Sequence, residues 1–262
     1  MEKSVFGGQG ESRLYGDLAW LFPIVSPLEQ YLDETELFCR KIAHNLRIPG
    51  TTLLHLGCGV GQNDFVFKRH FRVTGLDVSE PVLERARRLN PEVRYINGDM
   101  RSARLGEVFS VVAAVDCLDY MLTEADLRAA FATAWEHLAS GGVFFFLLGM
   151  TRERFGQNRT TSWTNSVGGT DVVFIENFYD PDPSDTRYES TMLYLIRQEG
   201  ELKIEHDRHP CGLFAEAQVR GLLAEVGFEI HHEDYHPTPE ALGHPGPAGE
   251  MSFPMFIARR RP

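Results

Sequence analysis

Three glycines and an aspartate, placed after two predicted strands, are the residues of this chain best suited to bind a ligand. The apolar run 52–56 stops at a turn with glycine at every second position: Gly57, Gly59 and Gly61. A glycine turn lets the backbone approach a ligand at contact distance, because a Cβ there would collide with it. The next apolar stretch ends at Asp77, and a carboxylate at the tip of a neighbouring strand can accept hydrogen bonds from both hydroxyls of a ribose. The pattern predicts a nucleoside-binding half-sheet.

The spacing of these glycines bears on which nucleoside is bound. Dinucleotide-binding enzymes prefer G-x-G-x-x-G, in which the third glycine packs helix on strand and the helix N-terminus receives a pyrophosphate. Here the third glycine comes one position early, at Gly61, and Gln62 follows it. An NAD(P)-dependent oxidoreductase is therefore the less favoured alternative for this site.

Further segments continue the alternation of strands and helices. Residues 93–97 read as a strand that is followed by an acid, and residues 108–115 as a continuous apolar strand. Residues 124–138 read as an amphipathic helix, and residues 143–148 as an apolar strand after a Gly-Gly pair. A continuous apolar run is typical of a strand covered on both faces, and Thr123 is a candidate N-cap for the helix. With closing strands at 227–230 and 251–258, these segments predict an α/β fold: a Rossmann-like sheet of seven mostly parallel strands with helices on both faces.

The composition and the patterning of apolar residues divide the chain into three parts. Residues 1–49 are rich in aromatic residues, contain a predicted helix from 27 to 45, and are expected to form an N-terminal helical cover. Residues 50–150 and 213–262 carry the nucleoside-binding core. Between them, residues 151–212 alternate apolar and polar positions between turn residues, which predicts an inserted antiparallel β lid on the acceptor side.

Composition disfavours several other classes of protein. A net charge of −11 is unfavourable for nucleic-acid binding, since contact with a phosphate backbone rests on clustered Lys and Arg. No apolar run reaches the roughly 18 residues of a membrane span, and the N-terminus lacks the apolar core of a signal peptide. The four cysteines are scattered without a C-x-x-C pair, as suits a reducing compartment. We therefore expect a cytoplasmic protein without nucleic-acid or membrane partners.

The densest group of possible metal ligands follows the predicted strand at 227–230 and comprises His231, His232, Glu233, Asp234 and His236. Adjacent residues on a strand point to opposite faces, so His231 and His232 would not bind one ion. We expect no metal site.

The glycine turn and the segments after it resemble the class I S-adenosylmethionine-dependent methyltransferases, from about Thr51 to Ala258. G-x-G-x-G is similar to the first motif of that family, whose ligand has a ribose but no phosphate. Within the family, the chain looks most like the small-molecule enzymes that dimethylate the amines of aminodeoxysugars. The shared phrases are Gly98-Asp99-Met100-Arg101, Leu105-Gly106, Phe109-Ser110 and Leu213-Phe214.

The resemblance implies that S-adenosylmethionine is the cofactor, leaving as S-adenosylhomocysteine. It places Asp77 on the ribose and Val78 beside the adenine, with Asp99 and Met100 at the adenine's edge and face. Asp116, at the end of the fourth strand, would lie near the cofactor's amino group. The methionine part would be lined by Gly57, Cys58, Gly59 and Gly61.

Methyl transfer from a sulfonium is an in-line displacement, so catalysis is largely positioning. An acceptor held about 3–3.5 Å from the methyl group can remove roughly 7–11 kcal/mol of barrier. A base is needed only to supply a neutral amine or to deprotonate a hydroxyl. The candidate bases are Tyr120, His209 and Asp119. In the resemblance, Tyr15 and Tyr31 match tyrosines of the N-terminal cover that approach cofactor and acceptor.

Each candidate base also has a structural alternative. His209 fits a lid residue bonded to backbone, Asp119 a turn residue before a helix, and Tyr120 a packing ring. The acceptor is a small molecule in this interpretation, but the choice between amine and hydroxyl stays open. A homodimer stays open too.

Two positions depart from the pattern of the family. His55 stands where family members usually carry an acid that helps to fix the charged methionine end of the cofactor. Residues 149–152 replace the acid, proline and aromatic residues that follow the fifth strand in the sugar enzymes, so the acceptor pocket should differ. The first departure keeps a further alternative open, a cofactor-binding regulator without catalytic activity.

Overall fold

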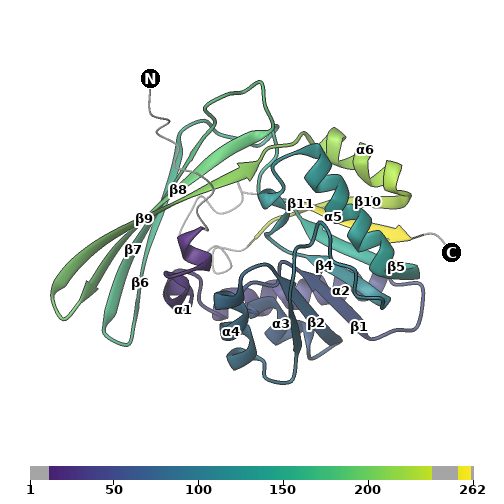
Figure 1. The fold of residues 1–262 in the computed structure, drawn as a ribbon, viewed down its shortest axis with the longest axis horizontal. Coiled ribbons are helices and arrows are strands. Elements are labelled where there is room, and N and C mark those ends of the chain that lie inside the picture. The colour runs from purple at the N-terminus through teal and green to yellow at the C-terminus, as the bar shows by residue number, and fades with distance from the viewer. Residues whose placement is uncertain (1–11, 238–252, 261–262) are drawn as a thin grey trace.

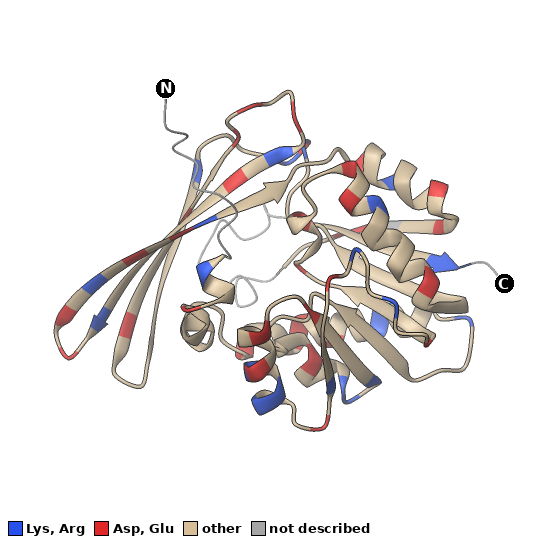
Figure 2. Ribbon diagram, viewed as in Figure 1, with Lys and Arg blue, Asp and Glu red and all other residues tan. Residues whose placement is uncertain are grey.

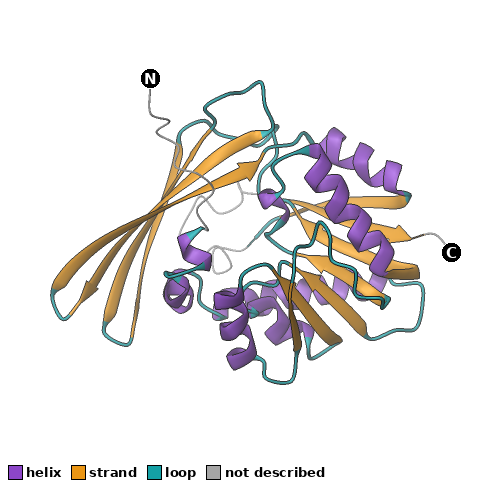
Figure 3. Ribbon diagram, in the orientation of Figure 1, coloured by secondary structure: helices purple, strands orange, loops and turns teal. Residues whose placement is uncertain are grey.

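The computed structural model describes residues 12–237 and 253–260, which fold into two β-sheets with helices around the larger one (Figures 1 and 3). Residues 1–11 of the predicted cover lie outside the described residues. The same holds for residues 238–252 and 261–262 of the predicted core.

The larger sheet has seven strands in the order β10-β11-β5-β4-β1-β2-β3. β1 pairs in parallel with β2 and β4, β2 pairs with β3, and β4 pairs with β5. β11 lies between β10 and β5 and is antiparallel to both, so it runs opposite to the other strands of this sheet. The strands are β1 (Thr52–Leu56), β2 (Arg72–Asp77), β3 (Arg94–Asn97), β4 (Phe109–Ala114), β5 (Leu138–Leu147), β10 (Phe228–Tyr235) and β11 (Phe253–Arg260). The predicted seven-stranded, mostly parallel sheet is confirmed.

The order of the strands reverses at β1, which has β2 on one side and β4 on the other. Loops that leave neighbouring parallel strands in opposite directions open a crevice at such a reversal, beyond the carboxyl ends of the strands. The glycine turn follows β1, Asp77 ends β2, and Asp116 comes just after β4. The sheet therefore brings the predicted ligand-binding residues to one edge.

Alternate residues of each strand pack against helices on opposite faces of this sheet. Phe144 and Phe146 of β5 lie in one buried cluster with Phe131 of α5. Phe145 lies in the other, with its ring centroid 5.0 Å from that of Phe38 in α2. The helices are α2 (Glu29–Asn45), α3 (Gln62–Phe67) and α4 (Glu80–Leu89) on one face, and α5 (Glu124–His137) and α6 (Glu216–Val226) on the other. This two-sided burial explains the continuous apolar strands.

One helix lies in a different layer from the predicted one. The sequence placed α2 in the N-terminal cover, but Phe38 and Ile42 pack on the core sheet. Thr35 of α2 also donates a hydrogen bond to Asn63 of α3, at 2.6 Å. The part of the chain that covers the site is shorter and consists of η1 (Arg13–Tyr15), η2 (Ala19–Leu21) and α1 (Phe22–Val25).

The second sheet is antiparallel, with four strands in sequence order, and lies across the cover from the core sheet (Figure 1). Its strands are β6 (Arg159–Val167), β7 (Thr170–Tyr179), β8 (Arg187–Gln198) and β9 (Glu201–Gly212). Phe174 and Tyr194 of this sheet share a buried cluster with Leu21 and Phe22 of the cover. The Trp163 indole donates to the carbonyl of Val25, at 3.1 Å. We call this sheet the lid.

Charged side chains of both signs are interspersed over the helices and the lid (Figure 2). Several form ion pairs at the surface, such as Arg94 with Glu107 at 2.9 Å and Lys68 with Glu92 at 2.8 Å. Within the described ranges, no helix is long and apolar enough to cross a membrane.

Candidate active site

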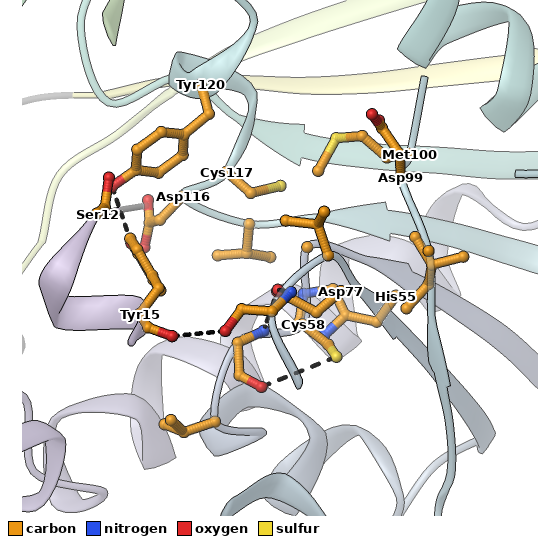
Figure 4. A pocket seen from close by; sticks show the side chains of 18 of the residues that line it. Ser12, Tyr15, His55, Cys58, Asp77, Asp99, Met100, Asp116, Cys117 and Tyr120 are labelled. Carbon is orange, nitrogen blue, oxygen red and sulfur yellow. Dashed lines mark hydrogen bonds between the residues drawn. The ribbon is translucent and has the colours of Figure 1, made fainter. Parts of the chain in front are cut away.

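A cavity of about 580 Å³ lies at the strand-order reversal, between the core sheet and the cover (Figure 4). Every site residue predicted from the sequence lines it except Gly61, Asp119 and His209. The predicted residues in its wall are Tyr15, Tyr31, Gly57, Cys58, Gly59, Asp77, Val78, Asp99, Met100, Asp116 and Tyr120. Its volume is that of a typical small-ligand pocket.

Gly57 and Gly59 form the floor of this cavity, and both adopt a left-handed backbone conformation, with φ of +64° and +55°. A Cβ on Gly57 would lie 2.5 Å from Cβ of Cys117, whereas a Cβ on Gly59 would meet no protein atom within 4 Å. Gly59 thus leaves open space in which a ligand can approach the main chain.

Gly61 serves a different purpose from the one that the resemblance implied. It does not line the cavity, and a Cβ on it would lie 2.7 Å from both Asn90 Nδ2 and Tyr95 Oη. Its carbonyl accepts a hydrogen bond from Asn90 Nδ2, at 2.8 Å. In this structure the third glycine allows α3 to pack closely against the neighbouring layer.

Asp77 is held in a fixed orientation at the end of β2. Its Oδ2 accepts from the Gly59 amide at 2.8 Å, and its Oδ1 accepts from the Ser79 amide at 2.9 Å. Burial raises the pKa of this carboxyl, while the two amide contacts act in the opposite direction. Each carboxylate oxygen has a second lone pair, so the side chain can also accept from the hydroxyls of a ribose.

The wall beyond Asp77 carries Val78, which is 71% exposed, together with Asp99 and Met100. Arg101 pairs with Asp99, the shortest contact being 2.6 Å, and this lowers the pKa of the Asp99 carboxyl. An apolar slot with an ionised acid at its edge suits an adenine, which presents an amino donor on its edge and a flat face.

The opposite end of the cavity is acidic. Asp116 projects into it from a left-handed backbone conformation, φ +52°, which is uncommon for a residue other than glycine. Burial raises the pKa of Asp116 to about 6, with the nearby His55 acting in the opposite direction. Burial and the neighbouring Asp116 raise the pKa of Glu34 to about 8. A cationic group would be stabilised at this end.

His55 lines the same end and forms a buried pair with Asp64 of α3. The distance from His55 Nδ1 to Asp64 Oδ1 is 2.7 Å, and the two side chains are 1% and 0% exposed. Among the described residues, His55 Nε2 has no hydrogen-bond partner. A buried imidazole with an unpaired nitrogen in the cavity wall, beside the carboxylate of Asp116, fits the amino-acid end of S-adenosylmethionine.

Tyr15 and Tyr120 in the cavity wall begin a series of hydrogen bonds that runs away from the cavity into the lid. The hydroxyls of Tyr120 and Tyr15 are 2.9 Å apart, and Tyr120 Oη lies 2.7 Å from His209 Nδ1. His209 Nε2 is 2.7 Å from Asp207 Oδ2. His209 is fully buried behind Tyr120 and is bonded through its ring to side chains, not to backbone.

Asp207 belongs to this series of hydrogen bonds, and the sequence analysis did not predict it. It lies two residues before His209 on β9, and residues i and i+2 of a strand share a face. The D-x-H spacing could have indicated that Asp207 and His209 lie next to each other on one face of the strand.

Asp119 occupies a different place from the other candidate bases. Its carboxylate accepts hydrogen bonds from the backbone amides of Gly149 and Met150, beyond the end of β5, and it does not line the cavity. Burial raises its pKa to about 7. These contacts fit the structural alternative for Asp119, and a catalytic role for it stays a prediction.

No group of three or more His, Cys, Asp or Glu side chains that could hold a metal ion occurs in the part of the chain that the structure describes. His231, from the densest group in the sequence, is exposed and pairs with Glu233 at 3.1 Å.

Comparison with known proteins identifies the cofactor. A family model described as a methyltransferase domain matches residues 53–142. A dTDP-3-amino-3,4,6-trideoxy-alpha-D-glucopyranose N,N-dimethyltransferase of Streptomyces venezuelae is 41% identical over 196 residues, which cover 73% of this chain and 81% of the relative. A dTDP-3-amino-3,6-dideoxy-alpha-D-glucopyranose N,N-dimethyltransferase of Streptomyces fradiae is 28% identical and covers 76% and 79%.

Solved structures share the whole fold. DesVI of Streptomyces venezuelae has a TM-score of 0.78 at 22% identity and covers 94% of this chain and 98% of its own. The S-adenosylmethionine-bound amino pentose methyltransferase CalS10 of Micromonospora echinaspora has a TM-score of 0.77 at 22% identity, with 99% of each chain covered.

These relationships favour neither the oxidoreductase nor the non-catalytic regulator. The glycine turn, the acid that ends β2 and the unpaired His55 Nε2 at the far end all suit one ligand, S-adenosylmethionine. The chain belongs to the class I S-adenosylmethionine-dependent methyltransferases and methylates a small molecule.

Proposed function

We propose that this enzyme transfers methyl groups to the amine of a nucleotide-linked aminodeoxysugar. The observation that carries the proposal is the hydroxyl of Tyr120, which faces the cavity and lies 2.7 Å from the buried His209. An amine reaches the site mostly as an ammonium ion and must lose a proton before its lone pair can attack. The chain is similar to two N,N-dimethyltransferases of dTDP-linked aminodeoxysugars, which supports the same substrate class.

The electrostatics of the site also favour an amine over a hydroxyl acceptor. Asp77 and Asp116 lie in the cavity wall, and Glu176 lies within electrostatic reach of His209. Acidic groups attract an ammonium and stabilise the positive charge that the nitrogen keeps after methylation. A net charge of −11 and interspersed surface charges support a small-molecule partner over a nucleic acid (Figure 2).

When bound, S-adenosylmethionine supplies a methyl group on a positively charged sulfur. Asp77 would hold its ribose and Asp99 with Met100 its adenine, while His55 and Asp116 would hold the amino-acid end. Tyr120 would accept the proton of the acceptor ammonium as its own hydroxyl proton passes to His209 Nδ1. Burial raises the pKa of Tyr120 well above its usual value, so its hydroxyl is neutral before this exchange. The cover would exclude water from the cavity.

The test offers the purified enzyme a matched pair of acceptors. One is a dTDP-linked aminodeoxysugar, and the other is the same sugar with a hydroxyl in place of the amine. With S-adenosylmethionine present, mass spectrometry should show a mono- and then a dimethylated amine, and no product from the hydroxyl sugar. Methylation of the hydroxyl sugar with the amine untouched would contradict the proposal.

A substitution links this activity to the site. Tyr120→Phe removes the cavity hydroxyl but keeps the ring, so turnover of the aminosugar should fall by roughly 100-fold or more, within the range of general base catalysis. Calorimetry should show unchanged S-adenosylhomocysteine binding. An unchanged turnover number would place the base elsewhere.

A further inference from the structure

Asp207 lies outside the cavity, yet it makes more contacts than a lid residue needs for packing. It is 5% exposed, and its Oδ2 accepts from the Leu14 amide at 2.7 Å while also contacting His209 Nε2 at 2.7 Å. Its Oδ1 accepts from the Arg208 amide at 2.9 Å. The contact with His209 lowers the pKa of Asp207 despite its burial, so the side chain is an ionised carboxylate.

An ionised carboxylate can only accept hydrogen bonds, and this fixes the tautomer of the histidine. The hydrogen of neutral His209 must sit on Nε2, where it is donated to Asp207. Nδ1 then carries a lone pair that can accept from the Tyr120 hydroxyl 2.7 Å away. The Tyr120 hydroxyl has a second acceptor, the Tyr15 hydroxyl oxygen at 2.9 Å, and its single hydrogen can be donated to only one of the two. When that hydrogen lies on the His209 side, the Tyr120 oxygen keeps a lone pair for the cavity.

Acidic and hydroxyl groups surround the His209 ring. Besides Asp207 on its own strand, the ring faces Glu176 of β7, Tyr120 of η3 (Leu118–Tyr120) and Tyr15 of η1, whose ring centroid is 5.6 Å away. Glu176 accepts from the Ser190 hydroxyl of β8 at 2.6 Å. Burial raises the pKa of Glu176, while Ser190 and the nearby His209 act in the opposite direction.

Further titratable groups lie on the Tyr120 side of the ring. A neighbouring group of side chains consists of Asp119, Cys211 and Tyr188. Cys211 and Tyr188 each raise the pKa of Tyr120. The Cys211 thiol donates to the His209 carbonyl, at 3.6 Å. Burial and these groups keep Tyr120 a neutral hydroxyl.

We infer that Asp207 is a positioning residue that sets His209 and Tyr120 to remove a proton from the acceptor amine. The inference rests on the proposed function. In the step, the ammonium N–H bond breaks and its proton goes to Tyr120 Oη, while the Tyr120 hydroxyl proton goes to His209 Nδ1. The nitrogen keeps the electron pair of the N–H bond and uses it to form a bond to the methyl carbon, while the carbon–sulfur bond breaks and its own electron pair stays on sulfur. The proton on the imidazolium returns to solvent through Tyr120 when the product leaves.

The decisive variant is Asp207→Asn, which keeps an oxygen for the Arg208 amide at the Oδ1 position and puts an NH₂ group at the Oδ2 position, where the Leu14 amide loses its acceptor. The new amide group can donate to His209 Nε2, so the ring hydrogen moves to Nδ1 and the Tyr120 hydroxyl loses His209 as an acceptor. Below the pKa of the acceptor amine, the turnover number should fall by roughly 100-fold or more. The KM for the acceptor and the affinity for S-adenosylhomocysteine should not change. Asp171→Asn, an exposed acid of the same sheet, is the matched control.

The pH profile separates this role from a structural one. Above the pKa of the acceptor the amine arrives neutral, so the ratio of wild-type to Asp207→Asn turnover should shrink towards one. Tyr120→Phe should show the same convergence. A ratio that stays constant with pH would overturn the relay while leaving aminosugar methylation intact. No amine methylation by the wild-type enzyme would instead overturn the proposed function.

The tautomer itself can be measured without any acceptor. Nitrogen NMR of ¹⁵N-histidine-labelled protein should assign the hydrogen of His209 to Nε2 in the wild type and to Nδ1 in Asp207→Asn. A wild-type Nδ1–H tautomer would contradict the inference, whatever the enzyme methylates.

Discussion

The backbone amide of Leu14 donates a hydrogen bond to Asp207 Oδ2, 2.7 Å away and 193 residues further along the chain. The bond joins the cover to the lid at the oxygen that also contacts His209. The next residue, Tyr15, accepts from the Ser79 hydroxyl through its carbonyl at 2.5 Å, and Ser79 in turn donates its amide to Asp77. The cover is thus attached both to the proposed base and to the acid expected to hold the ribose.

Asp77→Asn should weaken cofactor binding. The carboxylate accepts from the amides of Gly59 and Ser79, and an asparagine would turn its NH₂ group towards one of them. Hydrogen bonds to charged groups contribute about 1.5–3 kcal/mol, so calorimetry should show roughly 10- to 150-fold weaker S-adenosylhomocysteine binding. Asp171→Asn, on the lid, should bind normally. Normal binding by the Asp77 variant would show that the ribose lies elsewhere.

Gly61→Ala should destabilise the fold by more than Gly168→Ala does. Both glycines have positive φ, +81° and +58°, but only at Gly61 would a Cβ meet neighbours, Asn90 and Tyr95, at 2.7 Å. Backbone strain should cost each variant about 1 kcal/mol, and overpacking should add about 1–3 kcal/mol at position 61. The measurement is the free energy of unfolding in denaturant. Equal losses would show that the close contact at Gly61 relaxes at no cost.

His55→Asn should affect one end of the cofactor only. Asparagine can still donate to Asp64 in the place of Nδ1, but it lacks the orphaned Nε2. Affinity for S-adenosylhomocysteine should fall about tenfold, as for loss of a hydrogen bond to a charged group. Affinity for 5′-methylthioadenosine, which lacks the amino-acid end, should stay the same. Equal losses for the two ligands would mean that His55 acts only through the shape of the cavity.

Asp119→Asn should flatten the pH dependence of stability. Burial raises the pKa of Asp119 to about 7, so the folded protein holds this proton more tightly than the unfolded chain. Stability from this group is therefore full below about pH 4 and is lost as the pH rises towards 7. The variant has no such proton, and its free energy of unfolding should change less than that of the wild type across this range. Parallel curves would show that the carboxyl titrates normally.

The cofactor half of the site could be predicted because its signals lie in short contiguous segments. A strand, a glycine turn and the acid after the next strand need only local sequence, and the structure places Gly57, Gly59 and Asp77 together in the cavity wall. The function of the third glycine, Gly61, could not be predicted in the same way, because it depends on Asn90 and Tyr95, which approach from later segments.

The lid side was harder to predict for the same physical reason. The proposed role of Asp207 depends on its hydrogen bond with Leu14 and, through His209, on Tyr120. Both residues are distant from Asp207 in the sequence. β6 contains the polar run 160–162 followed by a tryptophan, so it lacks the alternation of apolar and polar residues that would predict a strand. It nevertheless pairs along its length with β7. α2 has the apolar stripe of a packed helix, and sequence alone did not specify which surface it would meet.

The attachment of the cover through Leu14 and Tyr15 has a consequence for the proposed reaction if two methyl groups are added to one nitrogen. Spent cofactor must be exchanged between the transfers, and Ser12 and Tyr15 form part of the wall that encloses it. Lifting this wall separates Tyr15 from Tyr120 and dismantles the contacts around the acceptor. Dimethylation should therefore be distributive. The singly methylated sugar should dissociate and accumulate early in the time course, and it should then compete with unmethylated substrate for rebinding to the enzyme.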